Sequence, residues 1–163
     1  MHVVLCQPEI PPNTGNIARL CAATQVELHL IEPLGFSLDD KYLKRAGLDY
    51  WPMVKLFVWH TIGDYIAKNP SRRLIMTSAK RGVPAQLFEY DEEDALIFGK
   101  ETKGLSEAEF SLSPYCVRLP FAPNVTRDDN EVCVRSLNLS TACGILLYMA
   151  LDKSGVLDKW CDK

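Results

Sequence analysis

The feature that most restricts the fold of this chain is an alternation of short apolar runs with longer amphipathic segments. Six runs have the length and composition of buried strands: Val3–Cys6, Leu28–Ile31, Leu56–Trp59, Leu74–Thr77, Ala95–Phe98 and Cys116–Leu119. Helical patterns separate or follow them, at 16–24, 39–46, 61–68, 106–111 and 137–152. Alternation of this kind predicts an α/β fold in which a mostly parallel sheet carries helices on both faces.

One folding unit is expected. The 163 residues contain no repeat, low-complexity tract or linker, so residues 1–163 are predicted to form a single domain. No apolar run approaches the roughly 20 residues that span a bilayer, and no membrane partner is expected. The opening Met1–Leu5 lacks the features of a signal peptide, which predicts a cytoplasmic protein that begins with a strand.

The cysteines give no sign of a metal or disulfide framework. Six of them are scattered without a C-x-x-C pair, so neither a zinc site nor disulfides are expected. Cys6, Cys21 and Cys143 lie in apolar segments, where a free thiol behaves as a small hydrophobe. The sequence therefore predicts buried free thiols and no metal.

The charge distribution restricts the kind of nucleic-acid partner. A net charge of -3 argues against a protein that coats nucleic acid non-specifically, but it allows an enzyme that grips one RNA locally. The basic residues gather in four clusters: Lys41/Lys44/Arg45, Arg72/Arg73, Lys80/Arg81 and Lys100/Lys103.

Arg19 is the polar residue that the first helical pattern singles out. The buried stripe of this pattern consists of Ile17, Leu20, Cys21 and Thr24. At about 100° per residue, Arg19 points away from that stripe, and Asn16 lies three residues earlier on the same outward face. Both side chains are therefore predicted to be presented together at the start of a helix. A solvated arginine is the alternative interpretation.

The last helical pattern carries a second stripe beside its core stripe. Ser140, Gly144 and Tyr148 follow the spacing i, i+4, i+8. A glycine inside a helix costs up to ~1 kcal/mol relative to alanine, so Gly144 predicts the close approach of another backbone or a ligand. Tyr148 is then placed for contact with a partner.

Three segments combine small residues with polar side chains where an apolar run ends: Pro12–Arg19, Phe98–Leu105 and Arg135–Ser140. Parallel α/β proteins bind ligands beyond the carboxyl ends of their strands, and glycine offers main-chain groups without a Cβ in the way. The three segments therefore predict loops that hold a cofactor. Gly104 is followed by Leu105 instead of Lys-Ser or Lys-Thr, which excludes a P-loop, and no G-x-G-x-x-G fingerprint occurs.

In this order and spacing, the three segments resemble the signature motifs of the SPOUT RNA methyltransferases. Three further segments resemble one subgroup, the tRNA wobble-nucleotide 2'-O-methyltransferases of the TrmL/YibK type: Gln7–Asn16, Ile31–Phe36 and Ala46–Tyr50. The resemblance covers nearly the whole chain. It implies a SPOUT fold with a C-terminal trefoil knot, an obligate homodimer and S-adenosyl-L-methionine as the cofactor.

The resemblance also implies roles for individual residues. Carried over position by position, it places cofactor contacts on Thr77, Gly99, Glu101, Gly104, Leu119, Ser136 and Leu137. It gives Arg19 and Tyr148 functional positions, with Asn16 beside Arg19. The chain departs from the subgroup in a longer, acidic segment at 120–134 and in an added residue near Lys80–Gly82.

The implied activity is 2'-O-ribose methylation of nucleotide 34, a cytidine or uridine, in the anticodon stem-loop of tRNA, with tRNA-Leu isoacceptors as the expected substrates. Arg19 would bind the adjacent phosphate and stabilise the developing alkoxide. No histidine or carboxylate stands out as the general base, and arginine is effectively always charged. The alternatives are a SPOUT methyltransferase acting on a base or at another RNA site, and a catalytically inactive knotted RNA-binding module.

Overall fold

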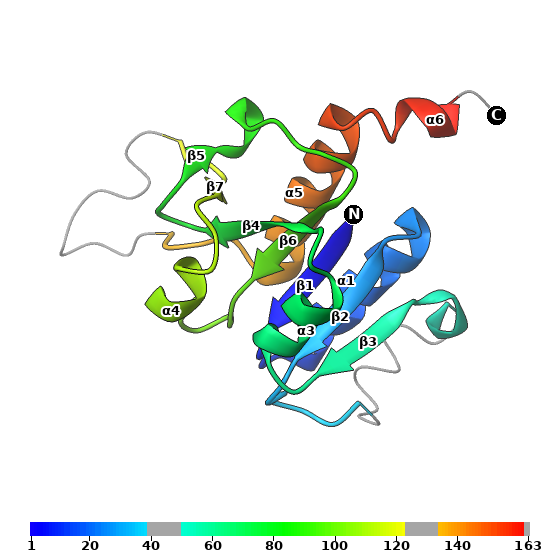
Figure 1. Ribbon diagram of the computed structural model, residues 1–163, viewed down its shortest axis with the longest axis vertical. Coiled ribbons are helices and arrows are strands. Elements are labelled where there is room, and N and C mark those ends of the chain that lie inside the picture. The colour runs from blue at the N-terminus through cyan, green and yellow to red at the C-terminus, as the bar shows by residue number, and fades with distance from the viewer. Residues whose placement is uncertain (39–49, 123–133, 162–163) are drawn as a thin grey trace.

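The computed structural model describes residues 1–38, 50–122 and 134–161. Its centre is a seven-stranded sheet in the order β3-β2-β1-β6-β4-β7-β5, and all the pairings between neighbours are parallel (Figure 1). The strands are β1 (His2–Cys6), β2 (Glu27–Ile31), β3 (Leu56–Trp59), β4 (Arg73–Ser78), β5 (Val83–Pro84), β6 (Asp94–Phe98) and β7 (Cys116–Arg118). The predicted parallel sheet is confirmed.

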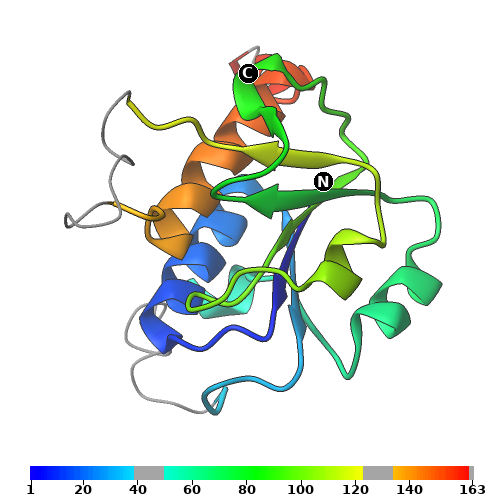
Figure 2. The same ribbon diagram turned by 90° about the vertical axis from the view of Figure 1, so that its left-hand side faces the viewer.

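Helices cover both faces of this sheet, as predicted. Figure 2 shows α1 (Pro11–Thr24, blue) and α5 (Leu139–Lys153, orange) on one face, with α3 (Ile62–Lys68) and α4 (Glu107–Phe110) on the other. The other helices among the described residues are short: α6 (Asp158–Cys161) and the 3-10 turns η1 (Trp51–Met53) and η2 (Ala85–Leu87). Within the described ranges, no helix combines the length and apolar character that crossing a membrane requires.

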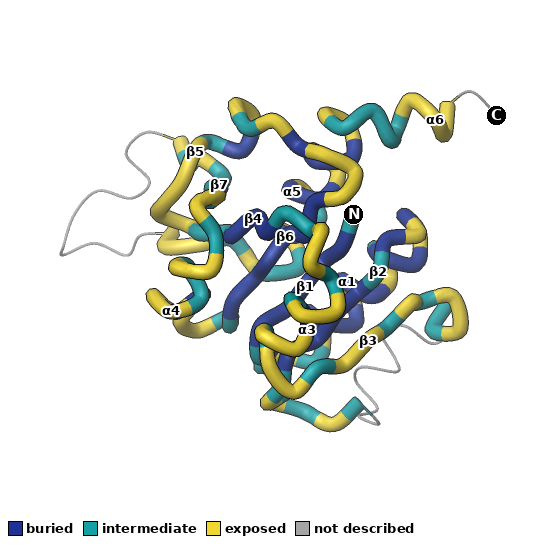
Figure 3. The backbone as a smooth tube through the Cα atoms, in the orientation of Figure 1, coloured by how far each residue is buried: buried dark blue, intermediate teal, exposed yellow. Residues whose placement is uncertain are grey.

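The core forms two apolar layers, one on each side of the sheet. Leu5, Ile17 and Leu147 belong to the layer under α1 and α5, whereas Val4 and Tyr65 belong to the layer under α3 and α4. Every residue of β1 and β6 is buried, as the tube in Figure 3 shows for the middle of the sheet. Strands buried on both faces read as continuous apolar runs, which explains why the sequence predicts them well.

The first helix begins earlier than the sequence pattern indicates. It starts at Pro11, so the predicted start near residue 16 is wrong, and the segment Pro12–Arg19 is helical instead of a loop. Proline is tolerated in the first helical turn because its missing N–H would have no intrahelical partner there. Asn16 and Arg19 consequently lie well inside the helix, although both are exposed on its outward face as predicted.

The other predicted helices differ little from the observed ones. The patterns at 61–68, 106–111 and 137–152 correspond to α3, α4 and α5. The helix predicted at 39–46 lies outside the described residues. The C-terminal trefoil knot and the single-domain organisation of residues 1–163 stay predictions.

Candidate functional site

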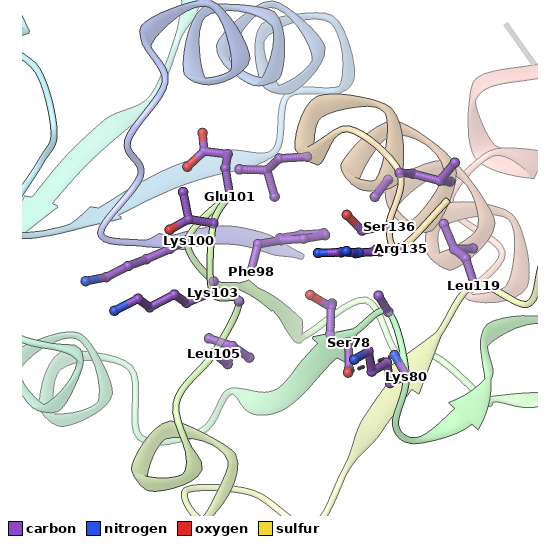
Figure 4. Close-up of a pocket in the computed structure, with 18 of the residues that line it drawn as sticks. Ser78, Lys80, Phe98, Lys100, Glu101, Lys103, Leu105, Leu119, Arg135 and Ser136 are labelled. Carbon is purple, nitrogen blue, oxygen red and sulfur yellow. Dashed lines mark hydrogen bonds between the residues drawn. The ribbon is translucent and has the colours of Figure 1, made fainter. Parts of the chain in front are cut away.

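A cavity of about 760 Å³ lies beyond the carboxyl ends of β4, β6 and β7. Its walls come from three chain segments around residues 77–81, 98–105 and 135–139, joined by Leu119 and by residues at the start of α1. Figure 4 shows side chains from these segments converging on the cavity. A space of this size, at this edge of a parallel sheet, suits a small-molecule ligand.

The structure brings all the predicted cofactor residues to this cavity. Its lining includes Thr77, Gly99, Glu101, Gly104, Leu119, Ser136 and Leu137. The Thr77 hydroxyl donates a hydrogen bond to the Ile97 carbonyl oxygen at 2.9 Å and so ties β4 to β6. Thr77 therefore stabilises the pairing of two strands and also lines the cavity. That these residues contact a cofactor stays a prediction.

Gly99 and Gly104 close the loop that follows β6. A Cβ on Gly99 would lie 2.1 Å from the Gly104 carbonyl carbon and 2.2 Å from the Leu105 nitrogen. Gly104 has a φ of +69°, and its N–H donates to the Lys100 carbonyl oxygen at 2.8 Å. The sequence predicts ligand access as the reason for Gly99, whereas the structure shows that the loop's own backbone already requires a glycine there.

Glu101 joins this loop to the beginning of α1. Its carboxylate accepts hydrogen bonds from the Glu9 N–H at 2.8 Å and the Ile10 N–H at 3.2 Å. It accepts a third from Asn13 Nδ2 at 3.1 Å. A carboxylate is favourable at this place because the N-terminus of α1, which follows Ile10, carries a partial positive charge. Glu101 is thus a positioning residue as well as a wall residue.

The Glu9 carboxylate makes a second connection between the segment before α1 and the loop after β6. Glu9 Oε2 accepts hydrogen bonds from the Thr102 N–H at 3.1 Å and the Thr102 hydroxyl at 2.8 Å. These hydrogen bonds are the main cause of a pKa of Glu9 below its ordinary value. The segment before α1 and the loop after β6 are therefore joined by two carboxylates, one from each of them.

Asn13 connects the third segment to the same network. Its Oδ1 accepts a hydrogen bond from Asn138 Nδ2 at 2.9 Å. Asn138 Oδ1 in turn accepts from the Ser140 N–H at 2.9 Å and the Thr141 N–H at 3.3 Å, which caps α5. Sequence reasoning favoured Asn16 and missed Asn13, which is 5% exposed and lines the cavity. The signal was present, because Asn13 lies four residues before Ile17 on the inward face of the helix.

The three predicted catalytic residues do not line the cavity of their own chain. Asn16 and Arg19 are exposed on α1, and Tyr148 is 46% exposed on α5. These two helices pack against each other, so the side chains belong to one outward surface. A Cβ on Gly144 would meet no heavy atom within 4 Å, so no described residue of this chain makes the predicted close approach.

Two of the predicted basic clusters border the cavity. Lys80, Arg81, Lys100 and Lys103 all line it, and Arg135 adds another cation. Arg81 also forms an ion pair with Glu107 on α4. The surroundings of the cavity are therefore positive, as an anionic ligand such as RNA would require.

Arg72 and Arg73 have structural partners instead. Arg73 forms a bidentate ion pair with the fully buried Asp94, at 2.7 and 2.8 Å, and Arg72 pairs with Glu93 at 2.7 Å. The cluster Lys41/Lys44/Arg45 lies outside the described residues.

A separate polar group lies at the amino ends of β1 and β2, away from the cavity. His2 and His29 both approach Glu27, with their Nε2 atoms 3.3 and 3.5 Å from its Oε2. These three side chains have the composition of a metal site. However, the Trp59 indole N–H donates to His29 Nδ1 at 3.0 Å. The neutral His29 ring then carries its proton on Nε2 and has no lone pair there for a metal.

This histidine group predicts an acid-sensitive fold. Burial is the main cause that lowers the pKa of His2 to about 3 and of His29 to about 4. Below pH 6.5 these two histidines are therefore protonated in the unfolded chain but stay neutral in the folded chain. The free energy of unfolding consequently decreases as the pH falls towards 4. We expect the free energy of unfolding to drop by about 2 kcal/mol per histidine between pH 7 and pH 5.

Urea denaturation at the two pH values measures this drop. His29→Gln should remove about half of this drop, because one of the two buried histidines is then absent. An equal drop in His29→Gln and in the unaltered protein would contradict the assignment.

Known proteins resemble this chain over almost its whole length. Residues 1–148 match the SpoU rRNA methylase family. The tRNA (cytidine(34)-2'-O)-methyltransferase of Escherichia coli (strain K12) is 41% identical over 159 residues, which are 95% of this chain and 94% of that protein. The enzyme of the same name from Methylovorus glucosotrophus (strain SIP3-4) is 45% identical over 150 residues, 91% of this chain and 92% of its own length.

Solved structures give the same result. The first is a structure described as giving structural insights into the 2-OH methylation of C/U34 on tRNA. It superposes on this chain with a TM-score of 0.84 and is 40% identical in sequence, and the match covers 93% of this chain and 94% of that chain. The SpoU methyltransferase AviRb from Streptomyces viridochromogenes, in complex with the cofactor AdoMet, has a TM-score of 0.77 at 23% identity. It covers 94% of this chain and 60% of that chain, and this likeness shows the fold.

Proposed function

Because this chain belongs to the SpoU rRNA methylase family, we propose that it transfers a methyl group from S-adenosyl-L-methionine to the 2'-hydroxyl of nucleotide 34 of tRNA. The predicted resemblance to the wobble-nucleotide methyltransferases is confirmed by relatives of that name. The observation that carries the proposal is the convergence of all the predicted cofactor residues on one cavity.

The cavity fits the proposed cofactor. It is large enough for a nucleoside with an amino-acid tail, and the loop between Gly99 and Gly104 presents its main chain on the wall. Apolar walls from Leu119 and Leu137 suit an adenine ring, whereas Glu101, held by three hydrogen bonds, fixes the loop. The cofactor supplies an already activated methyl group, so the protein chiefly aligns the reacting groups.

Arg19 supplies the electrostatic part of the reaction. Its guanidinium binds the phosphate next to the target ribose and stabilises negative charge on the attacking oxygen. Asn16, on the same helical face, supports contact with the RNA backbone.

A second copy of the chain completes the site. Arg19 and Tyr148 lie on the outward surface of α1 and α5 and not on the cavity wall. Ile145 is 42% exposed on α5, and Gly144 beside it leaves open space. These observations support a homodimer in which the α1–α5 surface of one copy serves the cavity of the other. A tRNA substrate also supports a cytoplasmic location.

The proposal is tested by mapping the product. The protein is incubated with labelled S-adenosyl-L-methionine and tRNA-Leu transcripts, and the digested RNA is analysed by mass spectrometry. We expect a 2'-O-methylated nucleotide at position 34 only, and no label on a transcript whose nucleotide 34 is a 2'-deoxynucleotide. A methylated base, or a methyl group elsewhere, would assign the chain to another modification. Cofactor binding without any transfer would leave an inactive RNA-binding module.

A further inference from the structure

Arg19 differs from Arg72, Arg73 and Arg81 in its contacts. These three arginines each pair with a carboxylate, and Arg73 and Arg81 contact aromatic rings as well. In the part of the chain that the structure describes, the contact of Arg19 is aromatic: its guanidinium carbon lies 4.5 Å from the centroid of the Tyr50 ring. No described carboxylate lies within ion-pair distance of Arg19.

The position of Tyr50 relative to α1 is fixed by the turn that follows it. Its carbonyl oxygen accepts a hydrogen bond from the Met53 N–H at 2.8 Å, which closes η1. Trp51, the next residue, packs against the apolar layer that contains Ile17. The turn η1 and α1 are in direct contact. The main chain of Tyr50 is therefore held next to α1 by the core contact of the following residue.

An arginine in contact with an aromatic ring can still bind a phosphate, whereas an arginine paired with a carboxylate is less free to do so. A carboxylate occupies the planar N–H donors of a guanidinium and neutralises its charge, whereas a ring contacts the π face and leaves donors at the edge. Those edge donors are the ones that bind a phosphate bidentately. Holding the side chain before the RNA arrives also lowers the entropy lost on binding.

We propose that Tyr50 is a positioning residue for Arg19, which it orients towards the phosphate beside the target ribose. The inference rests on the proposed role of Arg19 in methyl transfer. Loss of the ring leaves the charge in place but lets the long side chain sample many rotamers. A misplaced catalytic group costs up to about 100-fold in rate, and we expect about a tenfold loss of kcat in Tyr50→Leu.

The test compares Tyr50→Leu and Tyr50→Gln with Tyr50→Phe. The first two should lose methyl transfer to a similar degree, whereas Tyr50→Phe should be clearly more active because the ring remains. The affinity for S-adenosyl-L-methionine, measured by calorimetry, should stay unchanged in all three. Met53→Ala is the matched control, since Met53 is 59% exposed on the same turn.

The decisive measurement is a double-mutant cycle. In an Arg19→Ala background, Tyr50→Leu should cause no further loss of residual transfer, because its effect acts through Arg19. A tenfold loss in that background as well would overturn the inference. If Arg19→Ala is inactive but both ring-free Tyr50 variants are fully active, Tyr50 has no positioning role and the proposed function stands. Full activity of Arg19→Ala would instead remove the proposed role of Arg19 itself.

Discussion

Replacing Gly99 with alanine is expected to weaken cofactor binding strongly without unfolding the protein. The added Cβ would lie 2.1 Å from the Gly104 carbonyl carbon, a separation that only a shift of the loop main chain can relieve. The shift moves one wall of the cavity, and valine at the same position should act more strongly. We expect the Kd for S-adenosyl-L-methionine, measured by calorimetry, to rise at least about 100-fold, or about 2.7 kcal/mol.

Gly63→Ala is the matched control for this experiment. A Cβ at Gly63 meets only the Thr61 hydroxyl oxygen, at the ordinary separation of 3.5 Å, and α3 lies on the other face of the sheet from α1 and α5. Its cofactor affinity should equal that of the unaltered protein. A folded Gly99→Ala protein with unchanged affinity would show that the loop after β6 does not shape the cofactor site.

Replacing Arg19 with alanine should lower the rate of tRNA methylation by about 100- to 1,000-fold, the effect of removing one electrostatic donor from an active site. Arg19 is exposed and lies outside the cavity, so the melting temperature and the cofactor affinity should hardly change. Arg19→Lys should also be poor, because an ammonium group lacks the planar fork that binds a phosphate bidentately. Full activity of Arg19→Lys would reduce the role of Arg19 to a general positive charge.

Mixing two inactive variants tests whether Arg19 serves its own cavity or that of a second copy. A mixed dimer of Arg19→Ala and Gly99→Val contains one intact cavity and one intact Arg19, on different chains. Activity returns on mixing only if Arg19 acts across the dimer interface. No recovery, despite subunit exchange shown by a tagged chain, would place both parts of the site on one chain.

Much of the fold follows from local sequence patterns. The central strands are buried on both faces and read as apolar runs, so β1 and β6 are predicted to within one residue. The two-residue strand β5 is too short to produce a pattern. The start of α1 is earlier than predicted because the small and polar residues of Pro12–Arg19 are typical of a loop, whereas the first turn of a helix accepts Pro11 and Pro12.

The site depends more on contacts between distant residues. The wall residues could be placed by resemblance, but the network from Glu9 through Glu101 to Asn138 joins positions far apart in the chain. The group of His2, Glu27 and His29 also depends on contacts between distant residues, because the register that sets His2 opposite Glu27 exists only in the assembled sheet. Neither arrangement produces a periodic signal that a single sequence reveals.

The position of β1 has a consequence for how the chain folds as it is made. This first strand lies in the interior of the sheet, where His2 pairs with Glu27 on one side and with Ala95 on the other. At about 5–20 residues per second, β6 leaves the ribosome roughly 5 to 20 seconds after β1. During that interval one edge of an apolar strand lacks its neighbour, and unpaired edges of this kind favour association with other chains. This edge of β1 is therefore exposed during early synthesis and becomes covered when β6 pairs with it.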